Sequence, residues 1–257
     1  MHPKIIILSR PVATGNEAQF LKAHGFEWQP TGQSTDAERI IEFSGRLCYL
    51  SFDPNKHTQV ENAEYIRKLI QHGHESVLEH AQWTFLIDGV TRGFSHQLVR
   101  HRVGFSFSQL SQQYHDESEA VLLRPDGLED HSELSNEWKT IEAQINNFYK
   151  RALKTAPPTN DFSDRERTRY VRSFARSLLP NATRTILSVT ANARSLRHFL
   201  ALRGALEGDI EMRRVSELIY DMLRIEAPAV MFDFEKKALG DGSPLIVRSA
   251  GAGPALP

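Results

Sequence analysis

The stretch AQWTFLIDGVTRGFSHQLVRHR, residues 81–102, contains the change of pattern on which the fold class depends. Residues 81–90 alternate and are rich in large apolar side chains, which predicts a strand. Residues 91–102 follow at once with a helical pattern that ends in a basic cluster, and Gly104 is suited to stop that helix. The segment therefore predicts a fold that mixes strands with helices.

The rest of the chain adds further strands and helices in no strict βαβ order. Strands are predicted at 4–8, 120–125, 183–190 and 230–234, and helices at 14–24, 36–50, 58–72, 133–155, 162–179, 192–206 and 209–226. An α+β class is therefore expected, with a mixed central sheet flanked by long helices. We expect a single α+β domain over residues 1–238 and a flexible tail, rich in Gly and Pro, over residues 239–257.

Composition limits the classes of function. The 257 residues include 31 Lys plus Arg against 32 Asp plus Glu, so the formal net charge is −1. This balance argues against a protein that coats nucleic acid or an anionic membrane. The sequence has no run long enough to span a bilayer and no signal peptide, and one cysteine cannot form an internal disulfide. A cytoplasmic protein is expected.

The single cysteine, Cys48, is interpreted as a core residue. It shares a helical face with Ile41 and Ser44, and small residues on such a stripe usually pack inside.

Arg100, His101 and Arg102 form the first group that could carry chemistry. The structural alternative is a set of cations that complements a helix C-terminus. Successive helical residues point about 100° apart, however, so the three side chains would spread around a turn, as suits the binding of a polyanion. The Ser and Gln side chains of residues 106–113 add neutral donors and acceptors that can recognise a heterocycle. The spacing alone leaves both interpretations open.

Three other segments were considered as sites. In GHESVLEH, residues 73–80, the histidines are six apart, whereas a helical zinc motif needs a spacing of four, so no metal site is expected. Arg203 lies on the apolar stripe of residues 196–203, where a guanidinium is costly unless it meets an acceptor or reaches solvent. Of the arginines at 165, 169, 172 and 176, only Arg176 is expected to be partly buried, as a candidate phosphate ligand.

These residues resemble the signature of the flavin-dependent thymidylate synthases, which begins with Arg-His-Arg and ends in Ser-x-Arg-Tyr. Here the two parts are residues 100–102 and Ser111–Tyr114. Further family-like pieces are GRLCY (45–49), GHESVLEH (73–80), Gln97, Arg176 before LLP, and NARSLRHFLALR (192–203). The resemblance covers about residues 40–225, and the common order of several pieces makes it specific.

The resemblance implies an enzyme, a methyltransferase that adds a one-carbon unit to C5 of a uridine 5′-monophosphate without a protein nucleophile. It implies a homotetramer with active sites between subunits, non-covalently bound FAD, NADPH as reductant and methylenetetrahydrofolate as carbon donor. The partners would be nucleotide and folate small molecules, with neither nucleic acid nor membrane.

The residue roles come from the same resemblance. The residues that would hold FAD are His74, Ser76, Glu79, Arg100, His101, Arg102, Asn192, Arg194 and His198. Those that would bind the nucleotide are Gln97, Gln109, Ser111, Gln113, Arg176 and Arg203. Arg203 and Ser111 would act in catalysis, Arg203 by stabilising negative charge at the uracil N3/O2 edge and Ser111 as a hydrogen-bonding group.

The sequence departs from the family pattern twice. Gln113 stands where the signature has its final Arg, which in the family reaches the nucleotide phosphate, and the stretch between Arg102 and Tyr114 is one residue longer, with Gly104 inside it. We expect a looser loop beside the sugar and relaxed sugar recognition, with UMP accepted as well as, or instead of, dUMP. A UMP methylase of a nucleoside-antibiotic pathway is the second interpretation.

The sequence is also compatible with two other classes of protein. A flavin NADPH oxidase would result if Gln113 ruins the nucleotide site. A non-enzymatic RNA-binding module would use the Arg clusters, would show a steep salt dependence and would be colourless.

Overall fold

The computed structural model describes residues 3–53, 60–157, 160–240 and 242–249. It contains both helices and sheets, so the predicted α+β class is confirmed at that level. The chain forms two compact units. Unit 1 comprises residues up to Lys4, Ile87–Arg100 and Phe107–Ser188, and unit 2 comprises Ile5–Leu86, His101–Ser106 and the chain from Val189 onward.

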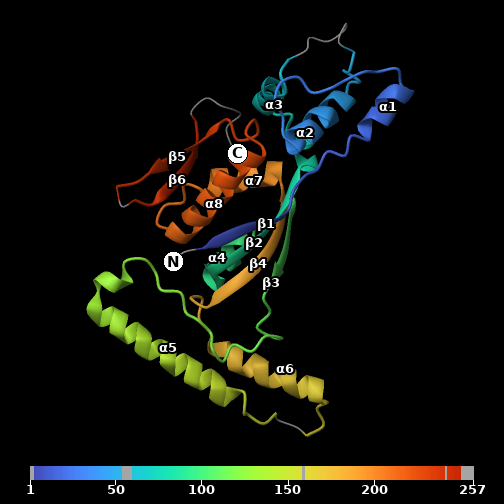
Figure 1. Cartoon of the computed structure of the whole chain (residues 1–257). Coiled ribbons are helices and arrows are strands. Elements are labelled where there is room, and N and C mark those ends of the chain that lie inside the picture. The colour runs from blue at the N-terminus through green and yellow to red at the C-terminus, as the bar shows by residue number, and fades with distance from the viewer. Residues whose placement is uncertain (1–2, 54–59, 158–159, 241, 250–257) are drawn as a thin grey trace. The chain divides into compact units, whose positions relative to one another are not determined.

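A four-stranded sheet has the order β1-β2-β4-β3, and Figure 1 labels its strands. The strands are β1 (Lys4–Ser9), β2 (Gln82–Thr91), β3 (Phe105–Gln109) and β4 (Arg184–Asn192). Along β2 the side chains of Trp83, Phe85 and Ile87 are almost fully buried and alternate with more exposed ones. Burial of a Phe or Ile side chain stabilises the fold by about 2 kcal/mol, so the alternating residues position this strand.

Two strands pass directly into helices by the same local device. Helix α4 (Arg92–Leu98) follows β2, and helix α7 (Ala193–Arg203) follows β4. The last strand residue is the helix N-cap in both cases: Thr91 Oγ1 accepts the Phe94 N–H and Asn192 Oδ1 accepts the Ser195 N–H, each at 2.9 Å. These side chains satisfy an N–H group that the first helical turn leaves without a backbone partner.

Unit 1 also contains two helices that pack on each other, α5 (Ser132–Ala152) and α6 (Asp164–Ala175) (Figure 1). Their shared apolar core is formed by Tyr149, Ala152 and Ala175. Helix α6 begins with a capping box in which Ser163 and Glu166 satisfy each other's backbone N–H groups. Two 3₁₀ turns, η2 (Leu128–Asp130) and η3 (Arg176–Leu178), precede α5 and follow α6.

Unit 2 contains the remaining helices. They are α1 (Glu17–Ala23), α2 (Asp36–Leu47), α3 (Asn62–Gln71), the 3₁₀ helix η1 (Glu75–His80), α7 and α8 (Ile210–Glu226). Helix α2 packs against α3 and η1, and α7 packs against η1 and α8. A buried polar network joins α2 to α3, because Glu42 accepts bonds from Arg46 Nε at 2.7 Å and from Asn62 Nδ2 at 2.7 Å. Both lone-pair regions of the buried carboxylate are therefore used.

Residues 244–248 form a strand within the segment expected to be a loose tail. Strands β5 (Phe234–Ala238) and β6 (Pro244–Arg248) pair antiparallel. The Asp233 carboxylate is fully buried and accepts bonds from Arg197 at 2.6 and 2.7 Å and from Arg248 Nε at 3.0 Å. This ion network and buried Ile246 anchor β6 beside α7 and α8. The assignment of residues 1–238 to a single domain stays a prediction, and residues 250–257 lie outside the described part.

Several predicted elements need correction. Of residues 120–125, only Leu122 pairs, in an isolated antiparallel bridge with Thr183, and Pro125 lacks the N–H that a longer ladder would need. The helix expected at 91–102 ends at Leu98, although the next glycine is Gly104. The basic cluster therefore lies in the connection between α4 and β3. Strand β3 was not predicted, and the strand expected at 230–234 begins only at Phe234.

The prediction that Cys48 packs in the core is wrong. The residue caps the C-terminus of α2, is exposed, and its thiol donates to the Ser44 carbonyl at 3.4 Å. The last buried residue of α2 is Arg46, and both Leu47 and Cys48 beyond it are exposed.

Within the described ranges, no helix combines the length and apolar character required to cross a bilayer.

Candidate functional site

His101 and Arg203 are joined by a hydrogen bond in unit 2. Arg203 Nε donates to His101 Nε2 at 3.0 Å. A guanidinium can only donate, so His101 Nε2 must accept, and the imidazole is neutral with its proton on Nδ1. The ring lies 5.3 Å from Phe199 and 5.9 Å from Phe105 between centroids, in edge-to-face and tilted geometries. The pair is thus held by α7 on one side and by the start of β3 on the other.

The surroundings of His101 lower its pKa from 6.5 to about 4. The largest cause is burial, and repulsion from Arg203 and His198 adds to it. The half-buried imidazole therefore stays neutral at physiological pH, which is the form that the Arg203 hydrogen bond requires.

This pKa predicts how stability depends on pH. The unfolded chain takes up a proton at His101 below about pH 6.5, while the folded chain resists until about pH 4, so stability should fall as pH drops through this window. After solvent screening the loss should be on the order of 2 kcal/mol. Urea unfolding at pH 7 and pH 4.5 measures it. His101→Gln, which keeps an acceptor for Arg203, should lose that part of the decline, and His96→Gln, on the exposed side of α4, should keep it. Equal pH slopes for wild type and His101→Gln would contradict the assignment.

Helix α7 and η1 bring further predicted residues together in unit 2. Arg194 Nη1 lies 2.7 Å from Glu79 Oε1 in an ion pair, and the Ala193 N–H donates to the Ala81 carbonyl at 2.9 Å. The side chains expected to hold a cofactor are largely exposed here, namely His74, Ser76, Glu79, Arg102, Arg194 and His198. Asn192 is the exception, since its side chain is buried and caps α7. Arg100, also exposed, belongs to unit 1.

Gly104 is packed closely, which differs from the looser loop that was expected. Its φ is +70°, and a Cβ at this position would lie 2.1 Å from Ser195 Oγ and 2.5 Å from Asn192 Nδ2. Its carbonyl accepts the Asn192 N–H at 3.3 Å, and Ser195 Oγ donates to the neighbouring Val103 carbonyl at 2.8 Å. The glycine thus lets the segment approach the N-terminus of α7 in unit 2, and its closest side-chain neighbours are predicted cofactor residues or lie beside them.

In unit 1 a second polar cluster forms around Thr185 of β4. Gln109 Nε2 donates to Thr185 Oγ1 at 3.1 Å and to Ser95 Oγ at 2.8 Å. Arg92 Nη1 donates to the Leu110 carbonyl at 3.2 Å and its Nη2 to Gln112 Oε1 at 3.2 Å. The two bonds that Gln109 Nε2 donates fix the orientation of its amide. The amide oxygen Oε1 is then the group that can accept a bond from a ligand.

Arg92 and Glu117 are functional candidates that the sequence reasoning missed. Burial lowers the pKa of Arg92, nearby Glu117 opposes this, and nearby Arg176 adds to it. Burial also raises the pKa of the Glu117 carboxyl, against the attraction of His115 and Arg92. One signal was available, because Arg92 is the first residue of α4, where the helix dipole disfavours a cation. Such a residue is expected only where an acceptor or an anion stabilises it.

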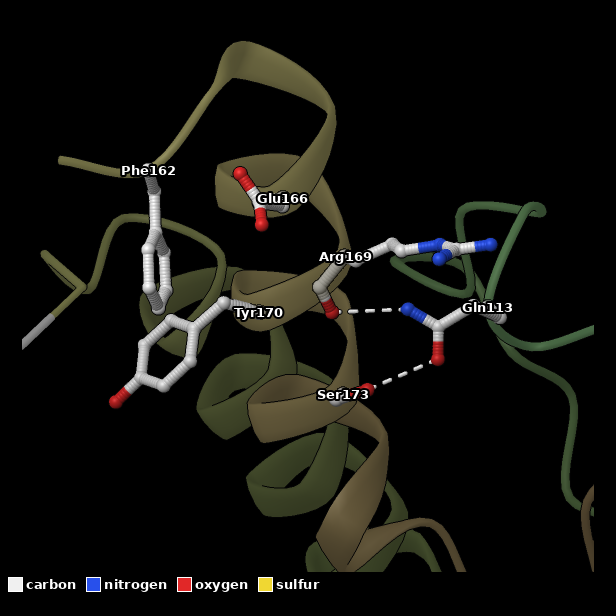
Figure 2. A pocket seen from close by; sticks show the side chains of 6 residues that line it. All are labelled: Gln113, Phe162, Glu166, Arg169, Tyr170 and Ser173. Carbon is white, nitrogen blue, oxygen red and sulfur yellow. Dashed lines mark hydrogen bonds between the residues drawn. The ribbon is translucent and has the colours of Figure 1, made fainter.

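The remaining predicted nucleotide residues also lie in unit 1, except Arg203. Gln97 is half-buried in α4, and Arg176 is half-buried in η3. Arg172 of α6 is also half-buried, which the sequence did not indicate. Ser111 Oγ accepts the Gln113 N–H at 3.2 Å, and Figure 2 shows Gln113 hydrogen-bonded to α6 at a pocket of about 590 Å³. The pocket is lined by Gln113, Phe162, Glu166, Arg169, Tyr170 and Ser173.

The structure therefore sorts the predicted residues into two clusters. Most of the residues expected to hold a cofactor lie in unit 2 with Arg203, and the other expected nucleotide residues lie in unit 1. Among the described residues no group of three or more His, Cys, Asp or Glu side chains is arranged to hold a metal ion.

A family model described as thymidylate synthase complementing protein matches residues 32–229. A protein of Mycolicibacterium gilvum (strain PYR-GCK), named flavin-dependent thymidylate synthase, is 40% identical over 233 residues, which cover 88% of this chain and 90% of the relative. Proteins of the same name from Corynebacterium diphtheriae and Mycobacterium tuberculosis (strain ATCC 25177 / H37Ra) are 36% and 39% identical, over 87% and 82% of this chain and 89% and 86% of their own.

Proposed function

Since the chain belongs to the flavin-dependent thymidylate synthase family and is a methyltransferase, we propose that it adds a one-carbon unit to C5 of a uridine 5′-monophosphate. We propose FAD as the bound flavin, NADPH as the reductant and methylenetetrahydrofolate as the carbon donor. The structural observation that carries the proposal is the hydrogen bond that fixes Arg203, at the C-terminal end of α7, on neutral His101.

The donor set of unit 2 fits FAD. A dinucleotide carries a pyrophosphate, which binds guanidinium, imidazole and hydroxyl donors, and Arg102, Arg194, His74, His198 and Ser76 offer these groups at the surface. The Arg194 guanidinium is already oriented by Glu79. When bound, FAD would supply the hydride transfer from NADPH that reduces the incoming carbon to a methyl group.

The residues of unit 1 suit the nucleotide. Gln97, Gln109 and Ser111 are neutral groups that can hydrogen-bond to ribose or to the uracil amide edge, and Arg176 offers a cation for the phosphate. Burial is the main cause that lowers the pKa of Arg92, and repulsion from Arg176 adds to it, so the two guanidinium groups lie near each other.

Arg203 is the group we propose for the chemical step. As uracil C5 becomes nucleophilic, negative charge develops on the ring oxygens, and a fixed guanidinium at the N3/O2 edge stabilises it. His101 holds the Nε edge of Arg203, so the guanidinium plane is set before the substrate binds. No thiolate is needed, and Cys48, the single cysteine, caps α2 with its thiol on the Ser44 carbonyl.

The test is the release of tritium from [5-³H]dUMP by purified protein with FAD, NADPH and methylenetetrahydrofolate, together with the flavin absorbance of the protein. We expect yellow protein, release of tritium and formation of thymidylate. Oxidation of NADPH without tritium release would identify a flavin oxidase. A colourless protein that takes up no added FAD would overturn the proposal, and RNA affinity with a steep salt dependence would then point to a binding module.

We further propose relaxed sugar recognition, with UMP accepted beside dUMP. Gln109 directs its amide nitrogen to Ser95 and Thr185, so its oxygen can accept a hydrogen bond from a ribose hydroxyl. Competing turnover of dUMP and UMP should give kcat/KM values within about tenfold, since one added hydroxyl that finds an acceptor costs little. Gln109→Leu should lower UMP turnover more than dUMP turnover. Complete rejection of UMP by the wild type would refute this part and leave the methyltransferase proposal intact.

The assembly is proposed to be a homotetramer, as the family resemblance implies. Light scattering should give four times the 29.2 kDa mass of the chain, and a monomer that is active at the same concentration would exclude it.

A further inference from the structure

The side chain of Gln113 ties the segment Ser111–Tyr114 to helix α6 through both ends of its amide. Gln113 Nε2 donates to the Arg169 carbonyl at 2.9 Å, and Gln113 Oε1 accepts from Ser173 Oγ at 2.9 Å. Figure 2 shows both bonds, with the amide lying between the two positions of α6. The amide nitrogen and the amide oxygen are therefore both engaged within the protein.

Two arginines of α6 also donate hydrogen bonds to this segment. Arg172 Nη1 donates to the Tyr114 carbonyl at 2.8 Å and to the Gln113 carbonyl at 3.4 Å. Arg169 Nη2 donates to the Tyr114 hydroxyl at 2.9 Å, and its guanidinium lies 6.0 Å from the centre of the Tyr114 ring. We call these contacts of Gln113 and Tyr114 with Arg169, Arg172 and Ser173 the α6 clasp.

The clasp suits a neutral side chain at position 113. Arg169 and Arg172 already place two guanidinium groups on residues 113 and 114, and a third cation there would be repelled by both. An amide also supplies one donor and one acceptor, which match a helix carbonyl and a serine hydroxyl. Glutamine at this position is therefore explained by its partners on α6.

The clasp reaches Ser111 through the backbone. The Gln113 N–H donates to Ser111 Oγ at 3.2 Å, and the Tyr114 and His115 N–H groups donate to the Ser111 carbonyl at 3.1 and 2.8 Å. Fixing residues 113 and 114 on α6 thus fixes the orientation of the Ser111 hydroxyl, which is one of the proposed nucleotide ligands.

We propose that Gln113 is a positioning residue, which acts through the α6 clasp to present Ser111 to the nucleotide and does not itself contact the phosphate. This inference rests on the proposed function, because it assigns a role at the nucleotide site of that reaction. On this inference a neutral residue at position 113 is compatible with nucleotide binding, because its amide is held by the Ser173 hydroxyl and the Arg169 carbonyl. The positive charge at this edge of the segment comes from α6.

The test is a double-mutant cycle measured by titrating dUMP, and UMP in parallel, into the FAD-loaded enzyme. Gln113→Met removes both amide bonds at similar size and should raise the nucleotide Kd about fivefold. Ser173→Ala should raise it about threefold, and the double variant should match Gln113→Met, because both changes break the same contact. Nucleotide KM should rise in parallel with Kd, and FAD content should be unchanged.

Two control variants complete the design. Ser173→Thr keeps the hydroxyl and should restore the affinity lost in Ser173→Ala. Thr168→Ala removes a hydroxyl on α6 that bonds only the carbonyl of Asp164 in its own helix and should change nothing. Because Ser173 is an exposed surface residue, its variants are expected to fold.

The outcomes separate this inference from the proposed function. If the wild type binds nucleotide but the effects of Gln113→Met and Ser173→Ala on Kd are additive, Gln113 acts independently of Ser173 by contacting the nucleotide directly. That result would overturn this inference and leave the proposed function intact. An unchanged Kd in Gln113→Met would overturn it too. A flavin-loaded wild type that binds neither dUMP nor UMP would overturn both.

Discussion

Replacing Arg203 with alanine is expected to lower kcat for thymidylate formation by about 10² to 10³-fold, the cost typical of removing one donor that stabilises developing negative charge. The guanidinium stands at the last turn of α7 with its Nε on His101, so no neighbouring side chain is expected to replace it in the same plane. Single-turnover tritium release from the nucleotide measures the chemical step apart from binding. Arg224→Ala removes an exposed arginine of α8 with only a 3.7 Å contact to Asp221 and serves as the matched control.

Arg203→Lys distinguishes charge from geometry at the same position. Lysine keeps a positive charge, but it is a point charge that cannot bond His101 along one edge and a substrate along another. Most of the loss seen in Arg203→Ala should therefore remain. Near-wild-type kcat in either variant, with flavin content intact, would remove Arg203 from the chemical step.

The parts of the fold that the sequence predicted are those with strong periodicity. Strand β2 has large apolar residues at alternate positions Trp83, Phe85 and Ile87, and α2 and α6 begin at Thr and Ser N-caps followed by Glu three positions later. Strand β3 was missed because its alternation, with Phe105 and Phe107 each followed by a serine, extends over only five residues, none of which is fully buried. Strand β6 was missed for another reason: its place is fixed by pairing with β5 and by the distant Arg197–Asp233 network, which no local pattern contains.

The site was predicted as residue types and only partly as an arrangement. Sequence order could mark the Arg-His-Arg cluster and the Gln-rich segment, because both are local. It could not show that Arg203 pairs with His101, which is 102 positions away in the chain, or that Glu117 lies near enough to Arg92 to affect its pKa. It also gave Cys48 the wrong surroundings, because burial at a helix end depends on where the neighbouring elements stop.

Gly104 shows how a glycine within a lengthened segment can be held tightly. The sequence suggested a loose loop, since glycine allows many conformations. In the structure the same freedom permits a φ of +70°. The absence of a Cβ also lets the Gly104 backbone pack closely against Asn192 and Ser195 at the start of α7. The conformation is thus selected by its close neighbours, and the residue supports the α7 N-terminus on which the proposed FAD ligands Asn192 and Arg194 lie.

Replacing Gly104 with alanine is accordingly expected to destabilise the protein by about 2 to 3 kcal/mol. The left-handed backbone costs an L-residue about 1 to 2 kcal/mol. Relief of the 2.1 and 2.5 Å overlaps would also displace the Ser195 hydroxyl from the Val103 carbonyl and disturb the Asn192 cap, and this would cost about 1 kcal/mol more. Urea unfolding measures the free energy of unfolding, and flavin titration should show weaker FAD binding. Gly208→Ala is the matched control, because Gly208 has φ of +72° in the same unit with no atom within 4 Å of the added Cβ. It should lose only the backbone contribution, and equal losses in the two variants would show that the contacts of Gly104 with α7 contribute nothing.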